Sequence, residues 1–80
     1  MSKPEYIRHD FVGCLGHLIE ECGEVLAAAG KTLRWGLAST NPELPPEKQE
    51  TNAQWLQREM RDLHEAMDRL QRCFDEGRLP

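Results

Sequence analysis

Two stretches of the sequence repeat apolar residues at the spacing of one helix face, and a proline-rich segment separates them. In both stretches the apolar residues recur in alternating steps of four and three. At about 100° per residue, such steps place every apolar side chain on one broad stripe of an α-helix. The first series is Phe11, Leu15, Leu18, Cys22, Val25 and Ala29, with a parallel row of Val12, Ile19, Leu26 and Leu33, and the second is Leu56, Met60, Leu63, Met67, Leu70 and Phe74. The pattern predicts two long amphipathic helices.

The first helix is expected to run from about Pro4 to about Leu33. Proline is tolerated in the first turn of a helix, and Gly36 is suited to end this one. Residues 37–46, LASTNPELPP, contain three prolines and are expected to form the connecting loop. A short loop between two long helices makes them antiparallel neighbours.

The second helix is expected to begin between Pro46 and Asn52. Thr51 followed by Gln54 has the capping-box pattern, which favours a start near Thr51. A chain of 80 residues makes one small domain, residues 1–80, and two helices cannot cover both apolar stripes. We therefore expect an all-α fold in which a homodimer or homotetramer completes a four-helix bundle.

Charge and cysteine content narrow the possible partners and the compartment. The chain has 14 acidic and 10 basic side chains, a net charge of −4, which disfavours binding to a nucleic acid polymer. The three cysteines have no CxxC spacing, so we expect a reducing cytoplasm and buried thiols rather than disulfides or zinc. No secretory leader is evident, and the longest apolar run, VLAAA, is too short to cross a membrane.

The first predicted helix carries three carboxylates inside an otherwise apolar segment, LIEECGEVLAAA. Glu21 and Glu24 are three residues apart, and Glu20 and Glu24 are four apart, so they share a side of the helix. Like charges at this spacing repel, and a divalent cation would turn that repulsion into attraction.

The second predicted helix repeats the arrangement with Glu59 and Asp62. Both acidic groups lie beside the apolar stripes, so the carboxylates should converge where the helices pack. A single such pair is more often an ordinary solvated surface. Two pairs that flank the packing stripes favour a site for an oxygen-loving cation such as Mg²⁺.

These motifs resemble the signature of the MazG-like, all-α nucleoside triphosphate pyrophosphohydrolases. The resemblance rests on Glu20-Glu21-x-x-Glu24 followed by Glu59-x-x-Asp62, with the flanks LIEECGEVLAAAGKTLRWG and TNAQWLQREMRDL, and covers about residues 11–74. The chain departs from the family in its shortness, because a complete four-helix core does not fit in one subunit.

The resemblance implies Mg²⁺-dependent cleavage of an NTP or dNTP between the α- and β-phosphates, as in the removal of unwanted nucleotides from the cellular pool. It implies Glu21, Glu24, Glu59 and Asp62 as ligands of Mg²⁺, with Mn²⁺ as an alternative ion. Glu20 and Glu21 are the implied catalytic acids, with Glu20 as an accessory ligand or as the group that orients the attacking water.

Four further residues are candidates for substrate binding. Lys31 and Arg34 could bind phosphates, although cations are also favoured at a helix C-terminus. Trp35 could stack on a base, although a core position is slightly favoured. Asn52 could bind a base edge or cap a helix.

The main alternative function is a non-catalytic helical dimerisation module, which the apolar spacing supports equally well but which gives no role to the acids. A di-iron bundle is disfavoured, because no Glu in the sequence has a His three residues later. His17 is interpreted as a structural residue.

Overall fold

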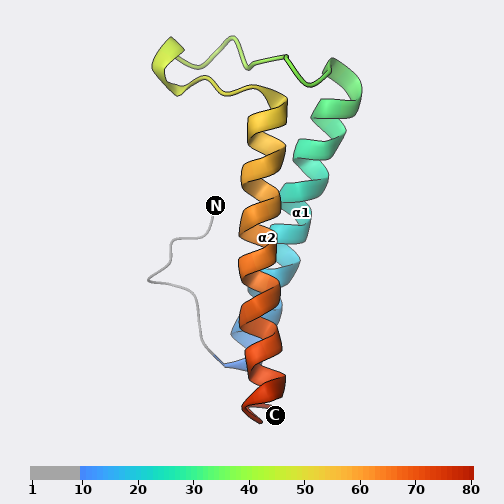
Figure 1. Cartoon of the computed structure of the whole chain (residues 1–80), viewed down its shortest axis with the longest axis vertical. Coiled ribbons are helices and arrows are strands. Elements are labelled where there is room, and N and C mark those ends of the chain that lie inside the picture. The colour runs from blue at the N-terminus through green and yellow to red at the C-terminus, as the bar shows by residue number, and fades with distance from the viewer. Residues whose placement is uncertain (1–9) are drawn as a thin grey trace.

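Two long helices packed side by side form the protein, as the computed structural model shows (Figure 1). The structure describes residues 10–80. Helix α1 spans Phe11–Trp35, helix α2 spans Asn52–Asp75, and a short 3₁₀ turn, η2, spans Pro46–Lys48 in the connection. The prediction of an all-α fold with two long antiparallel helices is confirmed. The predicted start near Pro4 lies outside the described residues.

The helices begin and end where local sequence signals favour it. The Asp10 side chain caps α1 by accepting a hydrogen bond from the Gly13 backbone N–H at 2.9 Å. Gly36 ends α1 at φ 91°, a conformation that glycine adopts without a Cβ clash. The predicted capping box begins α2, because Thr51 and Gln54 exchange side chain–backbone hydrogen bonds at 3.1 and 2.8 Å.

The connecting loop is tied to the start of α2 by backbone hydrogen bonds. Thr40 and Thr51 form an isolated antiparallel bridge. The N–H groups of Asn52 and Ala53 donate to the Ser39 and Leu37 carbonyls at 2.8 and 3.0 Å. The first N–H groups of a helix have no partner within it, so these bonds satisfy them and fix the loop against α2.

Small side chains fill the contact between the two helices. Among residues 10–80, the fully buried apolar residues are Cys14 and Ala28 from α1 and Ala66 and Cys73 from α2. Phe11 and Phe74 meet edge to face near the open end of the hairpin, with ring centroids 5.6 Å apart. The molecule extends over 45 × 24 × 13 Å, and its smallest dimension is close to the diameter of one helix. The hairpin is therefore a single layer of helix.

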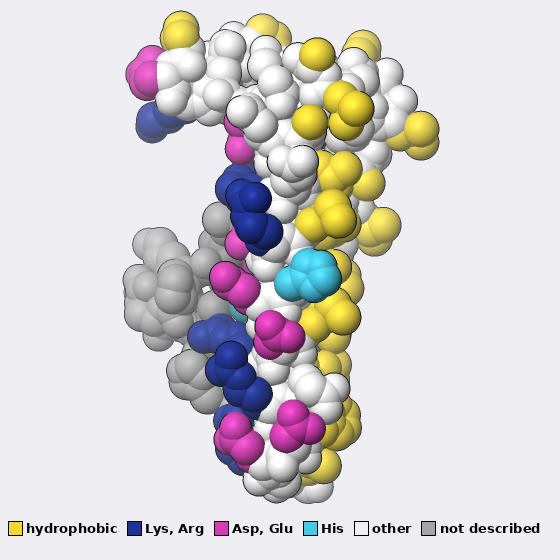
Figure 2. Space-filling model, in the orientation of Figure 1, with side chains coloured by type: hydrophobic (Ala, Val, Ile, Leu, Met, Phe, Trp, Pro, Cys, Tyr) yellow, Lys and Arg dark blue, Asp and Glu magenta, His cyan; other side chains and the backbone are white. Residues whose placement is uncertain are grey.

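A row of large apolar side chains remains exposed along one side of this layer (Figure 2). We call it the outer apolar stripe: Val12, Leu15, Ile19, Leu26 and Leu33 on α1, and Met60, Met67 and Phe74 on α2. An exposed patch of this extent is typical of a surface that binds a partner or another copy of the chain. Among residues 10–80, no helix has the length and apolar character needed to span a membrane.

Two burial predictions are wrong. For Trp35 a core position is slightly favoured over base stacking by the sequence, but Trp35, the last residue of α1, is 62% exposed. Cys22 was expected to be buried with the other thiols, but it is exposed, whereas Cys14 and Cys73 are buried. Cys22 belongs to the side of α1 that carries the outer apolar stripe, which α2 does not cover.

Candidate metal centre and adjoining cavity

Three carboxylates from the two helices meet in the middle of the hairpin. Glu21 on α1 and Glu59 and Asp62 on α2 each offer an oxygen, and these oxygens lie within 4.8 Å of one another. We call these residues the acid cluster. Glu59 and Asp62 are one helical turn apart and therefore face α1 together. Glu21 and Glu59 are only 3% and 1% exposed, so the cluster lies between the helices.

Each buried glutamate has one partnered and one unpartnered oxygen. His17 Nε2 lies 3.3 Å from Glu21 Oε1, one turn along α1. Arg58 Nη1 donates to Glu59 Oε1 at 2.9 Å. Neither Glu21 Oε2 nor Glu59 Oε2 has a hydrogen-bond partner among residues 10–80. Two buried carboxylate oxygens are thus left without the compensation that buried charges normally have.

The electrostatics of Glu21 reflect this environment. Burial raises the pKa of its carboxyl above the ordinary value, and the neighbouring charges of Asp62, Glu59 and Glu20 raise it further, against the opposite effect of His17. In the absence of a cation, the surroundings of Glu21 therefore make its ionised form less favourable than that of an ordinary glutamate. A divalent cation would instead favour three ionised carboxylates, and an all-oxygen donor set suits Mg²⁺ or Mn²⁺.

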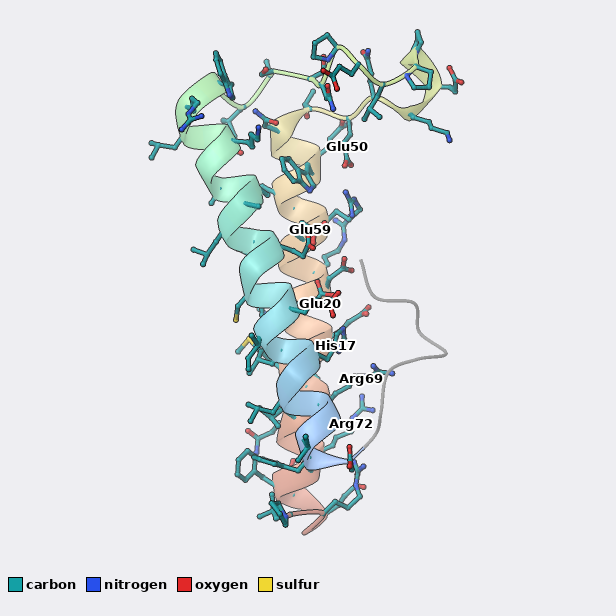
Figure 3. The ribbon with its side chains drawn as sticks, turned by 180° about the vertical axis from the view of Figure 1, so that it is seen from behind. His17, Glu20, Glu50, Glu59, Arg69 and Arg72 are labelled. Carbon is teal, nitrogen blue, oxygen red and sulfur yellow. The ribbon has the colours of Figure 1, made fainter. Side chains whose placement is uncertain are left out.

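The other two predicted acids of α1 are not part of the cluster. Glu24 lies about one turn beyond Glu21 and is half-buried, and Glu20 is exposed. Figure 3 shows Glu20, His17 and Glu59 on one side of the hairpin. The structure therefore brings together three of the five predicted acids, and it leaves Glu20 and Glu24 nearby on α1.

A cavity of about 820 Å³ lies at the loop end of the hairpin, near the acid cluster. It is bounded by the C-terminal end of α1, the connecting loop and the first turns of α2. Three predicted substrate-binding residues, Lys31, Trp35 and Asn52, line it together with Trp55. Arg34, the fourth, is exposed and does not line it.

Asn52 also has a structural role. It is buried at the start of α2, and its side-chain nitrogen donates to the Gly36 carbonyl at 3.0 Å and the Lys31 carbonyl at 3.3 Å. The Gly36 carbonyl follows the last turn of α1 and has no partner within the helix, so Asn52 satisfies this end of α1 from the other helix. Its amide hydrogens are thereby directed at the backbone.

Sequence reasoning missed an ion-pair network that connects the cluster to the cavity. Arg58 binds Glu59 through Nη1, and it binds Glu50 through Nη2 at 2.6 Å and Nε at 3.3 Å. The hydrogen bond to Glu50 raises the already high pKa of the guanidinium, so Arg58 is always charged. Glu50 lies in the loop, eight residues before Arg58, and no helical spacing could have indicated this pairing.

Comparison of the chain with protein-family models, with curated proteins and with solved structures found no match. The interpretation of the site therefore depends on the chemistry of the acid cluster and of the cavity beside it.

Proposed function

We propose that the protein is a Mg²⁺-dependent nucleoside triphosphate pyrophosphohydrolase, which cleaves an NTP or dNTP to a monophosphate and pyrophosphate. The observation that carries the proposal is the pair of buried, unpartnered oxygens on Glu21 and Glu59, next to Asp62. Ionised carboxylates are costly to bury without compensation, and a bound cation would supply it. The resemblance of the acidic motifs to the MazG-like enzymes points to the same ion and reaction.

The residues of the acid cluster would hold the ion, with Glu24 as a further ligand from the next turn of α1. A bound Mg²⁺ would neutralise phosphate charge and lower the pKa of a coordinated water. Glu20, exposed beside the cluster, would orient the attacking water. His17 and Arg58 would hold one oxygen each of Glu21 and Glu59, which leaves the other oxygen of each carboxylate directed to the ion.

The cavity at the loop end would receive the nucleoside. Trp35 and Trp55 offer aromatic surface for a base, and Lys31 offers a positive charge for a phosphate. Ligand sites of this kind usually combine apolar walls with a few polar groups, and this cavity has both.

The active form would be a homodimer or homotetramer in which the outer apolar stripes pack together. Both helices repeat apolar residues at heptad spacing on this surface, which suits packing against helices with the same repeat. A second copy of the hairpin supplies two such helices. Four helices would then enclose a core that the single layer lacks.

A direct test is to incubate the protein with a panel of NTPs and dNTPs and Mg²⁺, and to separate pyrophosphate from orthophosphate. We expect pyrophosphate and a monophosphate from at least one nucleotide, and no turnover by Glu59→Gln. Glu65→Gln is the matched control, because Glu65 is exposed on the same helix and outside the cluster. Orthophosphate as the first product would refute cleavage between the α- and β-phosphates.

The second candidate function is a non-catalytic dimerisation module, which the outer apolar stripe favours. The two functions differ in their response to metal. A dimerisation module should show no turnover of any nucleotide in the panel and no stabilisation by Mg²⁺ that depends on the acid cluster.

A further inference from the structure

Arg58 lies where the acid cluster and the cavity meet. One end of its guanidinium binds Glu59, a member of the cluster, and the Nε–Nη2 edge binds Glu50. Arg58 and Glu50 both line the cavity. In Figure 3, Glu50 and Glu59 lie on the same side of the hairpin, one above the other. The guanidinium thus connects a buried carboxylate with one at the cavity wall.

The two contacts of Arg58 differ in how readily they can be exchanged. Glu59 is 1% exposed, so breaking its ion pair would leave a buried charge. The Glu50 side chain is 34% exposed, so water can solvate its carboxylate when the ion pair breaks, and breaking this pair costs less than breaking the pair with Glu59. An incoming anion should therefore displace Glu50 and leave the bond to Glu59 in place.

The edge of Arg58 that Glu50 occupies is the one that best recognises a phosphate. The Nε and Nη2 hydrogens form a planar fork, which binds two oxygens of a carboxylate or of a phosphate in the same geometry. A phosphate group carries at least the charge of a carboxylate and offers an additional acceptor oxygen. Glu50 is thus chemically similar to the anion that this edge would bind.

We infer that Arg58 is a phosphate-binding residue at the junction of the cavity and the acid cluster, and that Glu50 is an internal carboxylate that occupies this position until a phosphate displaces it. The identification of the anion as part of a nucleotide rests on the proposed function. The recognition of a phosphate group depends only on the geometry of Arg58 and Glu50.

Substitutions of Glu50 and of Arg58 should change the affinity for pyrophosphate in opposite directions. Glu50→Gln removes the competing charge, so pyrophosphate should bind more tightly, by about two- to fivefold for the loss of a partly exposed ion pair. Arg58→Lys keeps the charge but loses the fork, so binding should weaken by about tenfold or more. In the double variant, Glu50→Gln should no longer tighten binding.

The test uses calorimetric titration of the full-length protein with pyrophosphate in the presence of Mg²⁺, and steady-state kinetics with any nucleotide it hydrolyses. Glu50→Gln should lower KM by the same factor with little change in kcat. Glu43→Gln is the matched control, because Glu43 lines the same cavity, and general relief of negative charge would affect both variants equally. Unchanged or weaker pyrophosphate binding by Glu50→Gln, or equal effects of the two glutamine variants, would overturn the inference.

Phosphate binding by Arg58 and nucleotide hydrolysis can be tested independently of each other. If no nucleotide is hydrolysed but Glu50→Gln tightens pyrophosphate binding, Arg58 binds phosphate and the hydrolase proposal is wrong. If nucleotides are hydrolysed but Glu50→Gln leaves KM unchanged, the hydrolase proposal stands and the Arg58 inference fails. Should Arg58→Lys not fold, Glu50→Gln and its Glu43→Gln control still decide the question.

Discussion

Glu59→Gln separates the stability of the hairpin from the binding of a cation. The substitution preserves shape at a position that is 1% exposed and removes one charge from the acid cluster. At an effective dielectric constant of 20, a like-charged neighbour within 4.8 Å repels Glu59 by about 3.5 kcal/mol or more. At 2.9 Å, Arg58 attracts it by about 6 kcal/mol before a discount for its partial exposure. Glutamine can still accept the Arg58 hydrogen bond. Without metal, we expect the variant to be as stable as the native protein or about 1 kcal/mol more stable.

With Mg²⁺ the order should reverse. A ligand at a hundredfold excess over its Kd stabilises the folded state by about 2.7 kcal/mol. In a domain of this size, 1 kcal/mol shifts Tm by about 4–8 °C, so the native protein should gain about 10–20 °C. Glu59→Gln should lose most of this gain, since one of the two buried, unpartnered oxygens is no longer part of a charged carboxylate.

The assay is a set of thermal melts at one fixed protein concentration, with Mg²⁺ and with chelator, for the native protein, Glu59→Gln and the Glu65→Gln control. Glu65→Gln should keep the full response to Mg²⁺. Equal Mg²⁺-induced shifts in the native protein and Glu59→Gln would remove Glu59 from the ion site. A strongly destabilised Glu59→Gln in chelator would show that the charge of Glu59 serves folding instead.

Three other predictions concern association, thiols and pH. Light scattering should find at least a dimer for the native chain and a monomer for Leu26→Glu, which places a charge in the outer apolar stripe; a native monomer at micromolar concentration would contradict the bundle. In that variant, a thiol reagent should label Cys22 before Cys14 and Cys73, because both of these are buried and burial raises the pKa of the Cys14 thiol; simultaneous labelling would count against the described core. The pKa of Glu21 is raised in the folded protein, so at a pH just above the ordinary value of 4.5 the folded protein binds more protons than the unfolded chain. The Tm measured in chelator should therefore fall as the pH rises above 4.5, and Glu21→Gln should make this fall smaller. An identical pH dependence of Tm in Glu21→Gln would contradict the buried position of Glu21.

The features predicted correctly from sequence are those that depend on neighbouring residues. The start of α2 follows from the reciprocal hydrogen bonds of Thr51 and Gln54, and the end of α1 follows from the positive φ that Gly36 adopts. Both signals lie within four residues of the helix end that they specify. Helix periodicity likewise depends only on spacing, and it correctly indicated two long helices.

The burial of individual α1 side chains was less predictable than the helix ends, because the apolar arc of α1 is wider than one partner helix can cover. The spacing did not indicate which part of that arc faces α2. In the structure α2 packs on Cys14 and Ala28, whose small side chains allow close approach, and Cys22 remains outside. The exposure of Trp35 depends on the path of the loop, which leaves α1 at Gly36.

The convergence of Glu21, Glu59 and Asp62 was predictable because it needs only two helices that pack along neighbouring faces. The exclusion of Glu24 from the cluster was not, since one helical turn of axial register decides which carboxylate faces Glu59. The network around Arg58 and the role of Asn52 depend on contacts with the loop and the end of α1. These contacts have no counterpart in local spacing, and only the folded chain reveals them.

The outer apolar stripe and the acid cluster lie on different sides of the hairpin, so association and ligand binding would use separate surfaces. Leu26, in the outer apolar stripe, lies about 140° around α1 from Glu21, at about 100° per residue. A second copy that covers the stripe therefore approaches α1 from a different side than a ligand of the acid cluster would. The carboxylates are held by α1 and α2 of one hairpin, and the cavity is lined by the same chain. Association would then stabilise the thin hairpin, in which the buried apolar residues of the described range 10–80 are all small, without having to supply the acids themselves.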